Sequence, residues 1–366
     1  MYLIRNRSED HVRISHKPPA GKPYWTAEVH LNRPIAGTQR LILVDEVRHK
    51  PYDHLISPPG GPAPHTAEYN IHYLKSNLQK TFRRREEIPC LATAVQLLHQ
   101  DTQEALRRIA VVLLEDAALC PYVYNHIIWL MYANSKGYKL RESDRQAVVD
   151  AVATGLEMTF RYNLDAPAST AILPTPDFWN APEEAQEAAI GPALRAAAGG
   201  MAFDTRFLTV LAERALKARN AGWEDFQSDR LAERALIGQL GIEDMALAVN
   251  YSSIPEFTVD SCMVIQAIDF HCYPRLLDDL PYKDAIWWHW SSLNVRPIID
   301  DGSETANAKE AAERARWYDT FRSIEGELRY TAGWVLGRMQ SEKTRPAVVT
   351  TLDMWLLGGK MAACGF

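Results

Sequence analysis

The chain has 366 residues, a net charge of −6 at pH 7 and 47% hydrophobic residues. A chain of this length can bury a large core in one or two domains, and its composition is typical of a soluble globular protein. The negative net charge excludes a general basic field, so any anion-binding surface must be a local patch.

The cysteines and the start of the chain bear on the compartment. The five cysteines are widely spaced and include no CxxC pair, which favours reduced, buried thiols over a zinc site. The first residues contain no apolar run long enough for a signal peptide, and no run approaches the ~20 apolar residues of a membrane-spanning helix. We therefore expect a cytoplasmic protein.

Residues 1–64 are predicted to form a small β region followed by a linker. The segments 24–34 and 39–49 alternate in polarity and are partly β-branched or aromatic, which is typical of strands. The residues between them, Pro34 to Gly37, suit a hairpin connection. Residues 57–64, SPPGGPAP, indicate a linker or an ordered loop. No GxxxxGK[ST] occurs, so the chain has no recognisable P-loop.

From residue 65 onward the periodicity becomes helical, and residues 65–366 are predicted to form one helical domain. Asp101 or Thr102 is expected to cap one helix, and Pro121 to begin an apolar helix that stops at Lys136-Gly137. Residues 162–200, with early prolines and later alanines, are expected to form a mobile surface excursion. The fold class is mainly α, with a small N-terminal β-hairpin region.

The stretch from Ser76 to Pro121 combines this helical period with regularly spaced charges. They form a basic cluster, an arginine pair and an acidic pair: Lys80, Arg83, Arg84, Arg85, Arg107, Arg108, Glu115 and Asp116. Here the chain resembles the C-terminal helical domain of the replication-associated recombination ATPases, the clamp-loader-like AAA+ family. Leu119 matches the family's leucine, whereas Pro121 arrives one residue early. The ATPase module is absent, so the resemblance implies a helical collar and a DNA-metabolism context. The alternative is a common helical hairpin whose charges form a structural network.

The leading edge of this stretch is a candidate DNA contact. Its cations would contact phosphates and supply affinity that does not depend on base sequence: Lys75, Lys80, Arg83, Arg84 and Arg85. The alternative is an ordinary solvated helix end, because cations favour the C-terminus of a helix.

The most enzyme-like cluster lies further along the chain. Asp269 and His271 follow an apolar run, and burial there would raise the pKa of the carboxyl. The alternative is a capping Asp and a core His. Downstream residues are candidates for stacking on a base, for positioning it and for holding a phosphate: Trp287, Trp288, Trp290, Asn294 and Arg296. Asp45 and Glu46, near the end of the second predicted strand, are the reserve acids, with ordinary surface charge as their alternative.

The whole chain also has a faint likeness to bacterial phage-defence DNA glycosylases that remove glucosylated hydroxymethylcytosine. That likeness implies base flipping, a carboxylate that stabilises an oxocarbenium-like sugar, and DNA as the partner. We expect no metal and no cofactor. A non-catalytic helical module that binds DNA or a replication partner is the second hypothesis, and an enzyme acting on small molecules is the third.

Overall fold

The computed structural model describes residues 1–6, 12–47, 71–117, 121–157, 161–162, 176–200, 202–220, 254–255 and 298–299. Seven α-helices and a four-stranded sheet account for most of these residues, which confirms the mainly helical class. None of the helices in these ranges has the length and hydropathy needed to cross a bilayer.

The described elements fall into two compact units. One unit contains the four-stranded sheet, helices α4 to α7 and the larger part of α3, and the other contains α1, α2 and the first residues of α3. The predicted domain boundary near residue 64 stays a prediction.

The sheet of the first unit has the strand order β2-β1-β4-β3. Its strands are β1 (Tyr2–Arg5), β2 (Val12–Ser15), β3 (Trp25–Ile35) and β4 (Thr38–Asp45). Two antiparallel pairs, β1 with β2 and β3 with β4, are joined by parallel pairing of β1 with β4. The sequence predicted β3 and β4 but not the two four-residue strands, so the hairpin region is half of a larger sheet.

The β3–β4 hairpin turns where the sequence predicted a connection. Ala36 and Gly37 both have positive φ, 48° and 75°. Two successive residues in this region are typical of the tight turns whose twist matches that of antiparallel strands. The turn pairs Ile35 with Thr38, and an irregularity between His30 and Ile35 shifts the register so that Trp25 becomes the partner of Asp45.

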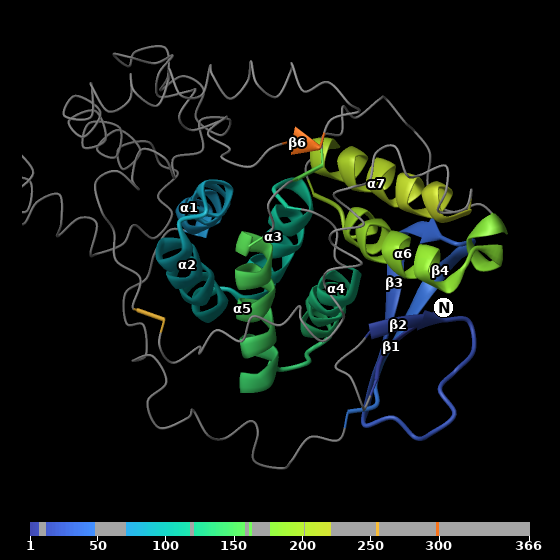
Figure 1. Cartoon of the computed structure of the whole chain (residues 1–366). Coiled ribbons are helices and arrows are strands. Elements are labelled where there is room, and N and C mark those ends of the chain that lie inside the picture. Colours follow the sequence, from blue (N-terminus) through green and yellow to red (C-terminus); the bar gives the residue numbers. More distant parts are fainter. Residues whose placement is uncertain are drawn as a thin grey trace, which may run out of the picture. The chain divides into compact units, whose positions relative to one another are not determined.

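Helices cover one face of this sheet (Figure 1). They are α4 (Pro121–Ser135), α5 (Glu142–Glu157), α6 (Glu183–Ala197) and α7 (Ala202–Asn220). α4 and α6 contact the strands directly, α5 packs on α4, and α7 packs on α6. The smaller elements of the unit are a 3-10 helix, Pro176–Asn180, and the parallel strands β5 (Arg161–Tyr162) and β6 (Ile298–Ile299).

α6 corrects the expectation of a surface excursion over residues 162–200, as far as residues 176–200 are concerned. Its Ala185, Ala189, Ile190 and Leu194 are fully buried. Small side chains let the helix approach α4 closely. A Cβ atom added to Gly191 would lie 2.4 Å from Asn125 Oδ1. The alanines that suggested a loose segment therefore allow tight helix packing.

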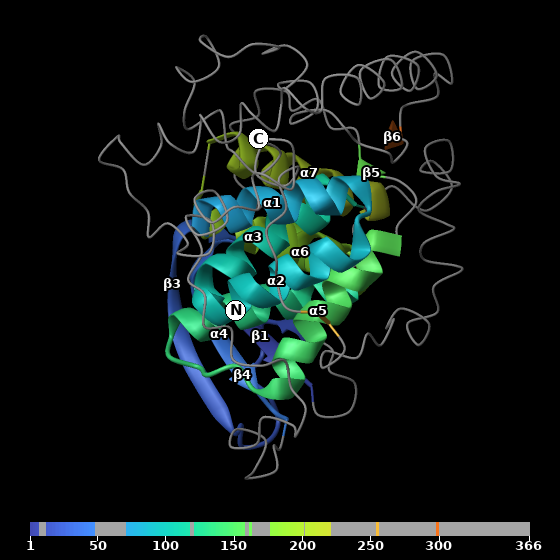
Figure 2. The same cartoon turned by 90° about the vertical axis from the view of Figure 1, so that its left-hand side faces the viewer.

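The second unit is a helical hairpin followed by the start of a third helix: α1 (Ile71–Arg84), α2 (Glu87–Gln100) and α3 (Thr102–Glu115). α1 and α2 lie side by side (Figure 2). Leu74, Leu78 and Phe82, spaced by four residues, form the buried face of α1. Asn77 Nδ2 donates a hydrogen bond of 2.8 Å to Thr93 Oγ1 across the buried interface.

Helix ends follow the predicted signals. Asp101 Oδ1 accepts the backbone N–H of Glu104 at 3.0 Å, so Asp101 caps α3. Pro121 begins α4, which ends at Ser135, and Gly137 follows with a φ of 86°. The N–H groups of Gly137 and Tyr138 donate to the carbonyls of Asn134 and Ala133, a Schellman end that glycine favours. Tyr138, which follows this turn, is buried in the interior.

Candidate functional site

The described residues include only part of the predicted site. The principal catalytic candidates, the stacking tryptophans and one predicted phosphate contact lie outside them: Asp269, His271, Asn294, Trp287, Trp288, Trp290 and Arg296. The roles assigned to these residues stay predictions. Both reserve acids, Asp45 and Glu46, are described, and they lie beside the most strongly charged centre in the interior of the first unit.

That centre begins at the ends of β1 and β4. Arg5 and Asp45 are the last residues of these strands and are register partners in the parallel pair. In the next strands Val12 pairs with Arg5, and Trp25 pairs with Asp45. Because cross-strand partners share a face, one row of side chains runs across all four strands. Its two charged members are 1% and 0% exposed.

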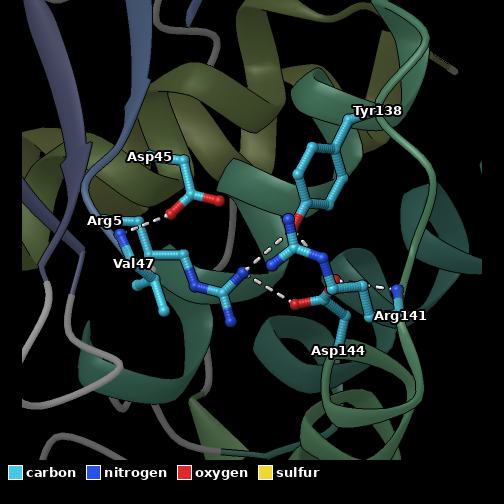
Figure 3. A network of polar contacts seen from close by, with 6 residues as sticks. All are labelled: Arg5, Asp45, Val47, Tyr138, Arg141 and Asp144. Atoms are coloured by element: carbon cyan, nitrogen blue, oxygen red, sulfur yellow. Dashed lines mark hydrogen bonds and ion pairs between the residues drawn. The ribbon is translucent and has the colours of Figure 1, made fainter. Parts of the chain in front are cut away.

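Arg5 extends from the sheet to the connection between α4 and α5 (Figure 3). Its Nη1 donates hydrogen bonds to Asp144 Oδ1 at 2.7 Å and to the Tyr138 hydroxyl at 3.3 Å. The same hydroxyl donates to Asp144 Oδ2 at 3.1 Å. Oδ2 also accepts the backbone N–H of Arg141 at 2.9 Å. Asp144 therefore also satisfies a backbone donor at the N-terminus of α5. Arg5, Tyr138 and Asp144 therefore form a continuous hydrogen-bonded network.

Aromatic rings surround this network. The Arg5 guanidinium lies 5.5 Å from the centre of the Trp129 ring. Trp129 and Tyr138 meet edge to face at 5.2 Å, and Trp25 contacts both rings. The Arg141 guanidinium lies over the other side of the cluster, 5.4 Å from the Tyr138 ring. Cations over aromatic faces are favourable contacts, and the rings also exclude water.

The two carboxyl groups of the centre differ in their surroundings. Asp144 receives three donors, one of them the Arg5 cation. Asp45 Oδ1 accepts the backbone N–H of Val47 at 2.9 Å. Burial raises the pKa of Asp45 above its ordinary value, although the Arg5 charge and the Val47 amide act in the opposite direction. The Asp45 carboxyl thus binds a proton more readily than an exposed Asp does.

Burial also shifts the neighbouring groups. It raises the pKa of Tyr138, and the Asp144 charge adds to that effect, so the phenol stays protonated. Burial lowers the pKa of Arg141, while the Asp144 and Asp45 charges oppose the change. The centre therefore contains phenol and guanidinium donors and one carboxyl whose pKa is raised by burial. Within the described ranges, no group of three or more His, Cys, Asp or Glu side chains is placed to bind a metal.

The predicted phosphate contacts on α1 have mixed surroundings. Lys80 is buried, with 5% of its surface exposed. Lys75 Nζ lies 2.6 Å from Glu104 Oε2 in an ion pair on the partly exposed surface of the unit. Arg83 and Arg85 are half-buried. Arg85, the residue after α1, has a φ of 57°, in the left-handed region. Lys80 is therefore not exposed for phosphate binding, and the DNA contacts assigned to the other cations stay predictions.

Arg107, one member of the arginine pair of the collar-like stretch, contacts the first unit's α6. Arg107 Nη1 and Nη2 donate to the carbonyls of Ala198 and Gly199 at 3.3 and 3.4 Å. Arg195 Nη1 donates to Gly199 O at 2.6 Å, and its Nε donates to Arg107 O at 3.1 Å. Two cations thus bind carbonyls at the C-terminal end of α6, where the helix dipole favours positive charge.

Four residues of the charged centre were absent from the sequence-based site: Arg5, Tyr138, Arg141 and Asp144. The available signal was weak. Tyr138 follows a predicted helix stop, and Asp144 lies in the first turn of α5, where acids are common. Arg5 ends a strand that the sequence did not predict, so nothing connected it with Asp45.

Comparison with known proteins gave no match to any family model, curated protein or solved structure. The described part of the chain thus defines a mainly helical protein whose small mixed sheet ends in a buried charged centre.

Proposed function

We propose that this protein is a DNA-acting enzyme, a glycosylase of the phage-defence type that flips a modified base out of the duplex and excises it. The product would be an abasic site. Such chemistry requires a carboxyl that stabilises an oxocarbenium-like sugar or orients the attacking water. One observation among the described residues supports it: Asp45 is a buried carboxyl with a raised pKa beside a cation and hydrogen-bond donors.

A carboxyl of this kind fits acid–base work because it changes protonation closer to neutral pH than an exposed Asp does. Asp45 is fully buried, so a substrate reaches it only after neighbouring side chains move. Glu46, the next residue, is half-buried and is the more accessible acid at this strand end. We therefore assign Asp45 and Glu46, together with Asp269, as the acids to test, and the cytoplasm as the location.

The test uses the full chain and three duplexes that differ only in one cytosine: unmodified, hydroxymethylated, and glucosylated on the hydroxymethyl group. Abasic sites are revealed by alkaline cleavage of the labelled strand. We expect cleavage of the glucosylated duplex, lost in Asp45→Asn or in Asp269→Asn with the fold intact. Asp150→Asn is the matched control, because Asp150 bonds Gln146 and lies outside the charged centre. No abasic sites on any duplex would refute the proposal.

The arginine pair bears on a second candidate function. Arg107 binds backbone carbonyls at the end of α6, so at least one arginine of the collar-like stretch has a structural role. A non-catalytic helical module that binds DNA or a replication partner would need only the end of α1 as its contact. This alternative predicts salt-sensitive duplex binding that Arg83→Ala with Arg85→Ala abolishes, with no abasic product.

A further inference from the structure

Two arginines lie against the connection between α6 and α7, and each binds backbone carbonyl groups. Arg107, from α3, donates from Nη1 and Nη2 to the carbonyls of Ala198 and Gly199 at 3.3 and 3.4 Å. Arg195, from the last turn of α6, donates from Nη1 to Gly199 O at 2.6 Å and from Nε to Arg107 O at 3.1 Å. Two cations from different helices therefore converge on one carbonyl oxygen.

The charges of these two cations are not balanced by neighbouring groups. Within the described part of the chain, no carboxylate forms an ion pair with either guanidinium. Burial raises the pKa of Tyr124 and Tyr132 well above the ordinary value, so the two phenols beside Arg195 are neutral. Asp204, in the first turn of α7, also acts on Arg195 through its charge. Two cations thus meet one carboxylate, which leaves a surplus positive charge in a largely buried place.

The point of convergence reaches the surface at two glycines. Gly199 is half-buried and Gly200 is exposed, and their φ values of 79° and 144° favour glycine. A Cβ atom added to Gly200 would lie 3.6 and 3.7 Å from Nη1 and Nη2 of Arg195. The guanidinium of this residue, which is 4% exposed, therefore lies against a position that has no side chain. Each Nη atom also carries a second N–H that the carbonyl bonds do not use.

We propose that Arg107, Arg195 and the two glycines form a binding site for a phosphate group. Guanidinium groups bind phosphate oxygens through paired N–H···O bonds, which suits donors that converge from two helices. The phosphate compensates the surplus positive charge, and its oxygens accept the N–H groups that the carbonyls leave unused. A carboxylate offers fewer oxygens and less negative charge, so it fits two converging arginines less well.

The shared chemistry of the ligand is the phosphate group, whether it belongs to a small phosphate compound or to the DNA backbone. The bound group would connect α3 with the end of α6 and the start of α7. The site shares no residue with the charged centre that contains Asp45, so it does not depend on base excision. Phosphate binding without abasic sites would refute the glycosylase and leave this site in place.

The experiment is thermal unfolding of the full chain at neutral pH, with inorganic phosphate exchanged for sodium chloride at constant ionic strength. Well above the dissociation constant, each tenfold increase in phosphate should raise the ratio of folded to unfolded protein about tenfold. We expect this increase in the wild type and not in Arg107→Gln. Phosphate also stabilises proteins through exclusion from their surface, and that contribution is common to both chains.

Arg40→Gln is the matched control, because it removes the same charge from an exposed pair in the β3–β4 hairpin. It should respond to phosphate as the wild type does. Equal responses of the wild type and Arg107→Gln, or no response in either, would overturn the proposal.

A direct binding measurement covers the case in which Arg107→Gln does not fold. Calorimetric titration of phosphate into the wild type and Arg107→Lys compares a guanidinium fork with an ammonium of the same charge. We expect about tenfold weaker binding by the lysine variant, the loss of one charge-assisted hydrogen bond. Unchanged affinity would contradict the proposal, because Arg107 would then not touch the phosphate.

Competition with an unmodified DNA duplex distinguishes the two sources of the phosphate group. Displacement of inorganic phosphate from the wild type by the duplex would identify a backbone phosphate as the ligand. Phosphate that stays bound in the presence of the duplex would identify a small phosphate compound.

Discussion

Two arginine–carboxylate pairs in the same unit have the same length and different surroundings. Arg5 Nη1 lies 2.7 Å from Asp144 Oδ1, and the two side chains are 2% and 0% exposed. Arg40 Nη2 lies 2.7 Å from Glu28 Oε2, and these side chains are 66% and 54% exposed. The distances alone suggest equal interactions. Solvent screens the outer pair and leaves its side chains mobile, so the contribution of that pair to stability is small.

The inner pair behaves differently because neither partner can return to water while the fold persists. Its ions have lost their hydration, and Tyr138, Trp129 and the Arg141 amide replace part of it. The net value of such a pair is modest, but removal of one partner leaves a buried ion without its counter-charge. Burial and partners, and not distance, therefore separate the two pairs.

The largest effect is expected from a substitution that breaks the inner pair, Arg5 with Asp144. Asp144→Ala leaves the Arg5 cation without this carboxylate and also removes acceptors from Tyr138 and the Arg141 amide. We expect a loss of about 3–5 kcal/mol in the free energy of unfolding. Urea unfolding measures it, with Asp150→Asn as the control. A loss below about 1 kcal/mol would place the inner pair in the class of the outer one.

The next effect tests whether the packing of α6 on α4 can relax. Gly191→Ala adds a Cβ that would lie 2.4 Å from Asn125 Oδ1 and 2.5 Å from Tyr124 Cδ1. Alanine ordinarily stabilises a helix relative to glycine, so a loss here reports on packing. We expect a loss of about 1–3 kcal/mol. Gly21→Ala, where no atom lies within 4 Å of the added Cβ, should be nearly neutral by the same thermal or urea assay.

A smaller loss of stability is expected for Arg107, because its hydrogen-bond acceptors are neutral carbonyl groups. Arg107→Ala removes two hydrogen bonds, of 3.3 and 3.4 Å, to the carbonyls of Ala198 and Gly199. No buried counter-ion is orphaned, so the expected loss is about 1 kcal/mol. Hydrogen exchange should rise first at the end of α6 and in its connection to α7. Unchanged exchange in that segment would contradict a role for Arg107 in holding it.

The smallest effect concerns the outer pair. Glu28→Gln removes a charge that is more than half exposed, and we expect a change within about 0.5 kcal/mol, reduced further by added salt. Parallel urea titrations at low and high ionic strength measure it. A loss comparable to that of Asp144→Ala would remove the distinction between the two pairs.

Local signals in the sequence predicted much of the fold. β3, β4, the cap at Asp101 and the stop at Gly137 depend on residues close together in the chain, and the structure has all of them. β1 and β2 escaped prediction because four residues give too little alternation to recognise. α6 was misjudged because alanines and a glycine give no strong hydrophobic period, although they suit close packing against another helix.

The candidate site was less predictable, for a different reason. Asp45 was among the reserve acids because it ends a recognisable strand. The members of the charged centre around Asp45 come from positions far apart in the chain: Arg5 lies 139 residues from Asp144 in sequence. A burial-driven pKa shift depends on such long-range packing, which composition and spacing do not encode locally. The roles proposed for Asp269 and the residues after it stay predictions.

The parallel join between β1 and β4 has a consequence for the order of folding. Each antiparallel pair, β1 with β2 and β3 with β4, closes over a short stretch of chain. The join between the pairs requires Tyr2 to meet Ile42, a more distant partner, and it carries Arg5 and Asp45 at its end. Contacts of long sequence separation form late, so the charged centre completes the unit after both ribbons exist. Changes there would mainly accelerate unfolding and leave the folding rate nearly unaltered.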